Sequence, residues 1–176
     1  AGLSNSVRGI VPGRQGTDGN AVNTIDFNII AIGGTSVDFG DLNFVMGGKG
    51  AACSNGHGGL SDGYDGTRIA PIFQGPGVGQ RALRLGGVNN SFTAITHIDF
   101  FDISTTGNAS RFGNLDTATA TEGRGSNNVI AITASGLGAS TNHINSTLFA
   151  SEGNSSDFGD LSAARGRVGG NGNSTR

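Results

Sequence analysis

A glycine-rich stretch at residues 47–66 gathers the side chains best suited to chemistry. It holds Cys53, His57, Asp62 and Asp65, and thiolate, imidazole and carboxylate groups are the usual protein ligands of zinc. The spacing lacks the paired cysteines or histidines that structural zinc sites use. A glycine-rich surface loop accounts for the same residues, so we expect no metal centre here.

The same stretch contains fragments of two other binding motifs. Residues 62–66, Asp-Gly-Tyr-Asp-Gly, resemble half of a calcium loop but lack the alternating Asp or Asn ligands and the late Glu. Lys49 lies among glycines, but Gly50 stands where a phosphate loop needs Ser or Thr. Since no asymmetric pair of carboxylates points to hydrolysis either, the chain is predicted to bind no cofactor and to have no enzymatic activity.

A second group of candidate residues follows this stretch. Arg81 and Arg84 are interleaved with Leu83 and Leu85, which predicts a strand with one basic face. Such a face could bind an acidic partner or a glycan, or it could belong to a solvated edge strand. The residues predicted to contact a partner or ligand are therefore Lys49, His57, Asp62, Tyr64, Asp65, Arg81 and Arg84.

A five-residue motif occurs three times in the chain. It shows how the elements that position these residues are repeated. It reads Asp-Phe-Gly-Asp-Leu at 38–42 and at 157–161, and Arg-Phe-Gly-Asn-Leu at 111–115. In each copy an isoleucine stands fourteen residues before the phenylalanine, with a glycine turn between them. Constant spacing of this kind indicates a structural repeat. We expect its core to be formed by Ile25, Phe39, Ile98, Phe112, Ile144 and Phe158.

The repeat unit is about 46 residues long, and each copy opens with a short apolar strand, near Arg8, Arg68 and Asn128. The middle of the chain exceeds this spacing twice, by about a dozen residues each time, which predicts insertions at about 47–66 and 76–90. Insertions in repeat folds map to surface loops, and the predicted ligand contacts fall in them. The units are predicted at about 5–52, 66–122 and 123–176.

Composition and periodicity predict an all-β fold. Glycine supplies 33 of the 176 residues and the 35% of hydrophobic residues come in short islands, as expected for short strands joined by tight turns. Ile25, Phe27 and Ile29 alternate with polar residues, the period of a half-buried strand. A repeat of this length matches one blade of a β-propeller, although three blades are too few to close a ring. A triangular solenoid or a glycine-rich sandwich is the alternative.

The charge of the chain argues against two classes of partner. A net charge of −2 gives no electrostatic reason to expect binding to nucleic acid or to an anionic membrane. No apolar run approaches the ~20 residues of a membrane-spanning helix. Cys53 is the only cysteine, so an internal disulfide is excluded.

The repeat resembles the kelch-like repeats of structural proteins from marine and freshwater tailed phages. The resemblance rests on the opening at 7–9 (Val-Arg-Gly), the strand at 23–27 (Asn-Thr-Ile-Asp-Phe), the turn at 105–109 (Thr-Thr-Gly-Asn-Ala) and the ending at 38–42. It covers 6–46, 66–74 and 91–176, and this chain departs from it through the two insertions and through Asn145-Ser146 in the third copy.

The resemblance implies a virion structural protein, of the fibre or capsid-decoration type, on the external surface or tail of the particle. Because three units leave edge strands unpaired, we expect such a chain to form homo-oligomers and to pack against other virion proteins. The alternative is a receptor-binding adhesin module, in which the insertions bind a host-surface glycan or protein.

Overall fold

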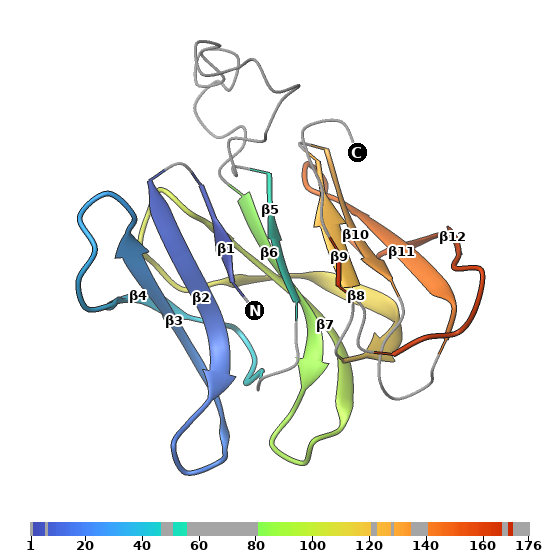
Figure 1. Ribbon diagram of the computed structural model, residues 1–176, viewed down its shortest axis with the longest axis horizontal. Helices are drawn as coiled ribbons and strands as arrows, with labels where there is room; N and C mark the ends of the chain where they lie inside the picture. Colours follow the sequence, from blue (N-terminus) through green and yellow to red (C-terminus); the bar gives the residue numbers. More distant parts are fainter. Residues whose placement is uncertain are drawn as a thin grey trace.

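The chain folds into three four-stranded antiparallel sheets that fan out from a common centre in the computed structural model (Figure 1). The structure describes residues 2–5, 7–46, 51–55, 81–120, 123–127, 129–134, 141–166 and 169–170. These residues form strands, turns and irregular segments, with no helix among them. The predicted all-β, propeller-like class is confirmed to this extent.

Within each sheet the strands follow one another in chain order, from an inner first strand to an outer fourth strand. The inner strands β1, β5 and β9 lie next to one another, while β4 and β12 lie at opposite sides of the molecule (Figure 1). The first sheet consists of β1 (Leu3–Ser4), β2 (Arg8–Gln15), β3 (Ala21–Ile29) and β4 (Val37–Asp41). The second consists of β5 (Ala51–Ser54), β6 (Arg81–Val88), β7 (Ala94–Asp102) and β8 (Ser110–Thr119), and the third of β9 (Gly123–Ser126), β10 (Ile130–Ala134), β11 (His143–Leu148) and β12 (Ser156–Asp160).

An asparagine that follows the first strand of each sheet is hydrogen-bonded to the backbone at or next to the start of the second strand. The side-chain Oδ1 of Asn5 accepts hydrogen bonds from the backbone N–H of Val7 (2.8 Å) and of Arg8 (2.7 Å). Asn127 does the same at the start of β10, and Oδ1 of Asn55 accepts from Arg81 N–H at 2.9 Å. Asparagine suits this role because its short side chain bonds the backbone a few residues further on.

These turns revise the alignment of the repeats. They show that the counterpart of Arg8 in the second sheet is Arg81 and not Arg68. In the third sheet the counterpart is Ile130. Two residues separate the asparagine from this position in the first and third sheets, whereas 25 residues separate Asn55 from Arg81. One insertion, at 56–80, therefore replaces the two that the sequence predicts.

The prediction of an insertion at 76–90 is wrong for the part that the structure describes. Residues 81–88 form β6, which pairs with β5 on one side and β7 on the other. Ala51 and Ala52, assigned above to the first unit, belong to β5 of the second sheet. The error arose because Thr67-Arg68 mimics the local sequence of a strand opening, and only strand pairing distinguishes the two.

Two apolar cores lie between the sheets. Ile25 and Ile98 are fully buried, and Phe39 and Phe112 are 3% and 4% exposed, so these four core predictions are confirmed. Phe39 meets Phe101 of the second sheet edge-on, with 5.4 Å between ring centroids. The core between the second and third sheets contains Cys53, Leu83, Leu85, Ile98, Phe112, Leu115, Ala131 and Phe149.

The same prediction fails in the third sheet. Phe158 is 57% exposed and Ile144 is only half-buried. Their counterparts are buried because a following sheet covers them, and among the described residues no sheet follows the third. Identical local sequence thus produces opposite burial.

A repeated set of backbone hydrogen bonds joins neighbouring sheets. The loop before β8 donates Gly107 N–H to Phe39 O (2.8 Å) and Ala109 N–H to Asp41 O (2.7 Å). In return, Asp41 N–H donates to the side-chain Oδ1 of Asn108 at 2.9 Å. The outer strand β4 is in this way hydrogen-bonded to the sheet that follows it.

The second joint reproduces the first. Gly153 N–H donates to Phe112 O (3.0 Å) and Ser155 N–H to Asn114 O (2.9 Å). Asn114 N–H donates to Oδ1 of Asn154 at 3.0 Å. We call this set of hydrogen bonds, together with the glycine described next, the inter-sheet joint.

The glycine of the repeated motif makes the inter-sheet joint possible. A Cβ atom at Gly40 would overlap the carbonyl oxygen of Gly107, and one at Gly113 would overlap that of Gly153. Only a residue without a side chain lets two backbones come this close. The motif therefore carries glycine for the contact with the next sheet and not merely for a turn.

We predict that Gly113→Ala destabilises the protein by about 1–3 kcal/mol, since the new methyl group can avoid the Gly153 carbonyl only if the second and third sheets separate. Gly107→Ala is the matched control, because a Cβ there meets nothing within 4 Å. Urea unfolding of both variants measures the difference. Equal losses of stability would show that the close approach is not what requires glycine.

Candidate functional site

The predicted ligand-contact residues divide into two groups. Lys49, His57, Asp62, Tyr64 and Asp65 lie outside the described residues. Arg81 and Arg84 lie in β6, in the interior of the second sheet. The interpretation of their strand as a solvated edge with a basic face is therefore wrong.

Arg81 connects the second sheet to the third. Its Nη1 donates to Phe149 O at 2.6 Å, and its guanidinium lies 4.8 Å from the centroid of the Phe100 ring. Arg8 does the same one sheet earlier, donating to Ile103 O at 2.9 Å and lying over Phe27 at 4.9 Å. A planar guanidinium suits both contacts, because it can donate a hydrogen bond while stacking on an aromatic face.

Arg8 is thus a structural residue that the sequence reasoning did not single out. The signal was present, since Arg8 precedes Phe27 by the same 19 residues that separate Arg81 from Phe100. In the third sheet Ile130 and Ser146 take these two positions. The last sheet therefore lacks the arginine–phenylalanine pair that both earlier sheets use toward their successor.

Arg84 forms a buried polar site between the first and second sheets. It is fully buried, and its Nε donates to Pro12 O in the first sheet at 3.2 Å. Nη1 donates to the carbonyl oxygens of Leu85 (3.1 Å) and Gly86 (2.9 Å). Asp99, also fully buried, stands directly opposite Arg84 in the β6–β7 register.

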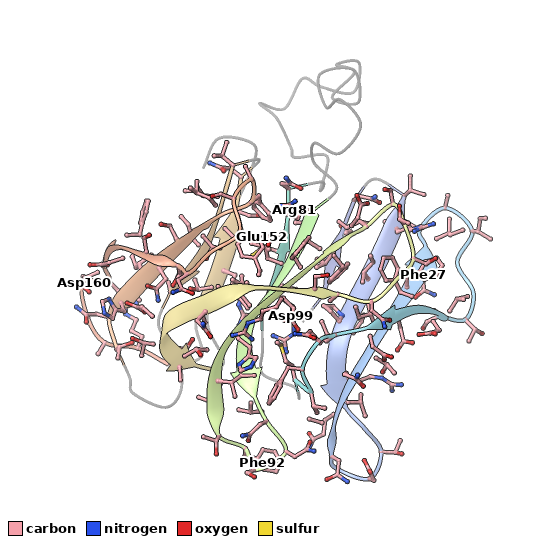
Figure 2. The ribbon with its side chains drawn as sticks, turned by 180° about the vertical axis from the view of Figure 1, so that it is seen from behind. Phe27, Arg81, Phe92, Asp99, Glu152 and Asp160 are labelled. Carbon is pink, nitrogen blue, oxygen red and sulfur yellow. The ribbon has the colours of Figure 1, made fainter. Side chains whose placement is uncertain are left out.

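The Asp99 carboxyl receives only part of the hydrogen bonding that a buried charge needs. Oδ2 accepts from Asn43 N–H at 3.1 Å, while Oδ1 has no hydrogen-bond partner among the described residues. Burial raises the pKa of Asp99 to about 6, and the charges of Arg111 and Arg84 partly oppose this rise. The side chain is fully buried and lies near the middle of the molecule in Figure 2. We therefore assign it a structural role between sheets and not contact with a ligand from solution.

An apolar hollow of about 440 Å³ lies on the third sheet. Its wall includes Ile130, Ile132 and Ala134, which alternate along β10, and Phe158 from β12. Gly169 and Gly170 also line it, and Gly170 lies close to the backbone of Arg124 in β9. We call the surface formed by Ile130, Ile132, Ala134 and Phe158 the third-sheet end face.

The first sheet exposes apolar residues on its far side. Ile30 follows β3 and donates its N–H to Val7 O at 2.9 Å, as Phe149 does to Val129 O after β11. Ile30 is 57% exposed, whereas Phe149 and the corresponding Ile103 are 2% and 0% exposed. Val11, the counterpart of Arg84, is 43% exposed. We call the surface formed by Gly9, Val11 and Ile30 the first-sheet end face.

The two end faces are the candidate functional site. Among the described residues, no three His, Cys, Asp or Glu side chains are grouped so that they could hold a metal ion. In the part of the chain that the structure describes, no helix is long and apolar enough to cross a membrane. The expectations concerning nucleic acid, cofactors and enzymatic activity stay predictions.

Comparison with known proteins identifies the fold alone. No protein-family model and no curated protein matches the chain. Among 82 chains of solved structures that match is the structure of YjhT, which superposes with a TM-score of 0.59 at 12% sequence identity. The match covers 92% of this chain but only 51% of the YjhT chain. The three sheets therefore correspond to about half of that fold.

We predict that Asp99→Asn removes a pH dependence from the stability of the protein. The folded-state pKa of about 6 lies above the value of about 3.9 for an unfolded aspartate, so between these values the folded state binds more protons. The free energy of unfolding of the wild type should then fall as the pH rises from about 4 to about 6, and this group should contribute no further change above that range.

Asparagine keeps the shape of the side chain without titrating, so the fall should be absent from the variant. Urea unfolding at successive pH values from about 4 to 7 compares the two proteins. Parallel curves for the wild type and Asp99→Asn would contradict the prediction.

Proposed function

We propose that this chain is a structural protein of a tailed-phage particle, a fibre or capsid-decoration subunit that acts by associating with further copies of itself. The three sheets would be the blades of an incomplete propeller. The repeated motif supports the phage assignment through the resemblance described above. The proposed assembly function rests on the exposure of the two end faces.

Phe158 differs sharply from its counterparts in the exposure of its side chain. Phe158 is 57% exposed, against 3% and 4% for Phe39 and Phe112. Leaving a phenylalanine in water forgoes roughly 1.5–3 kcal/mol of burial free energy. An exposed apolar patch of this kind, at the edge of an open array of sheets, is typical of an interaction surface.

The proposal places the chain on the outer surface of the particle, in contact with other virion proteins. The fold supplies a rigid unit with two unlike ends, which suits a protein whose role is assembly. The net charge of −2 offers no attraction for nucleic acid.

A receptor-binding adhesin module is the second candidate. The observation in its favour is the insertion at 56–80, which stands where the other two sheets need only two residues. Loops of this length are uncommon unless they are functional or disordered. The insertion begins directly after Asn55 and ends directly before Arg81, so the repeat itself does not require it.

We predict that the purified chain is oligomeric at micromolar concentrations in sedimentation velocity, because both end faces then become buried. A stable, folded monomer across that concentration range would contradict the assembly function.

We further predict that replacing residues 56–80 with the Ser-Val pair that joins Asn5 to Arg8 leaves the fold and the oligomeric state unchanged. The strand start at Arg81 would then have the same linker as in the first sheet. If the adhesin function holds, particles carrying this variant lose adsorption to the host cell. Unchanged adsorption would remove that candidate, and loss of the oligomer would show that the insertion takes part in assembly.

A further inference from the structure

The third-sheet end face carries the acceptor half of an inter-sheet joint. Gly159 pairs with Ile144 as Gly40 pairs with Ile25, so Phe158 and Asp160 occupy the register positions of Phe39 and Asp41. In the two internal joints the residues at these positions present their carbonyl oxygens to the next sheet. Figure 2 shows Asp160 at the outer margin of the molecule, on the opposite side from Phe27 of the first sheet.

Residues of the first sheet hold the sequence positions of the donor half. Gly34 stands five residues before Phe39, as Gly107 stands before Phe112 and Gly153 before Phe158. By the same spacing, Ser36 corresponds to the donors Ala109 and Ser155. Thr35 corresponds to Asn108 and Asn154. The N–H groups of Gly34 and Ser36 make no hydrogen bond outside the strand ladders among the described residues.

The space around Gly159 leaves room for a partner at this joint. A Cβ at Gly40 or Gly113 would overlap the next sheet, whereas one at Gly159 would meet nothing within 4 Å. The positive φ of Gly159 (141°) itself favours glycine at this position, and the open space beside it leaves room for a second chain.

The apolar contacts are complementary as well. The position of Ile30 is filled in the later sheets by Ile103 and Phe149, which are buried against the preceding sheet. Ile30 and Val11 would cover Ile132 and Phe158, whose counterparts Ile10 and Phe39 lie in the first core. Since Ile130 replaces the arginine of the earlier sheets, this contact is apolar where the internal ones use a guanidinium.

Resting on the proposed function, we propose that the third-sheet end face of one chain binds the first-sheet end face of a second copy and forms a third inter-sheet joint. Gly34 N–H donates to Phe158 O, and Ser36 N–H donates to Asp160 O. The hydroxyl oxygen of Thr35 accepts from Asp160 N–H, as the Asn108 and Asn154 side chains do from Asp41 and Asn114.

Two copies are enough to close the assembly. Each chain brings three sheets, and a head-to-tail contact that is repeated after half a turn closes a ring with two identical joints. Six sheets lie within the four to eight blades of known propellers.

The first test disrupts the third-sheet end face. Sedimentation of the wild type should give twice the 17.6 kDa of one chain, and Phe158→Asp should give a monomer. The urea midpoint of the variant at low protein concentration should be unchanged, since the side chain is already 57% exposed within one chain. Phe92→Asp is the matched control, because Phe92 is 60% exposed but lies at the tip of the β6–β7 turn (Figure 2), and it should remain a dimer.

The second test identifies the contact itself and does not depend on the folding of a Phe158 variant. Thr35→Cys and Asp160→Cys are prepared separately and then mixed under oxidising conditions. The mixture should give a disulfide-linked dimer on a denaturing gel, whereas each variant alone should give little, and the buried Cys53 of the wild type should give none.

The outcomes separate the two proposals. An oligomer that survives Phe158→Asp and gives no specific cross-link would overturn this joint and leave the self-association of the proposed function standing. A wild-type monomer would overturn both.

Discussion

The close approach of backbones at Gly40 and Gly113 is the constraint on which the rest of the structure depends. Each glycine admits the carbonyl oxygen of the following loop, and this places the donors of that loop against the outer strand of the preceding sheet. The apolar cores then close behind the contact. A side chain at either position would separate two sheets, and the cores between them would open to water.

The inner and outer ends of each sheet are held in different ways. At the outer end, backbone hydrogen bonds and glycine set the spacing, so the contact depends little on side-chain identity. Nearer the centre, Arg8 and Arg81 reach carbonyl oxygens of the next sheet. The second sheet, which has neighbours on both faces, also buries the Arg84–Asp99 site. Burying such charges costs free energy. This cost raises the pKa of Asp99 toward neutral pH.

The first and second sheets present carbonyl acceptors and a glycine to the sheet that follows them, and the second and third sheets present donors to the sheet before them. In the proposed assembly, the third sheet and the first sheet of a second copy would supply the two halves of one further joint. The proposed assembly function rests on this repeated contact. It needs no catalytic group, and the non-repeating insertion at 56–80 is then free to serve another purpose.

The sequence by itself determined the local structure: the strands around Ile25, Ile98 and Ile144, the glycine turns, and the equivalence of the three motif copies. These follow from alternation, turn chemistry and spacing, which are properties of neighbouring residues. It did not determine where the insertion lies, because Arg68 and Arg81 have similar surroundings in the chain and only strand pairing selects Arg81. Nor could it place Arg84 in the interior, since that depends on the first sheet covering the second.

Phe39 and Phe158 show most clearly what local sequence cannot predict. Both stand in Asp-Phe-Gly-Asp-Leu, yet one is buried and the other is largely exposed. Local sequence fixes which face of a strand a side chain occupies, but burial requires a second surface that packs on that face. Tertiary structure supplies this surface for Phe39, and in the single chain nothing among the described residues supplies it for Phe158.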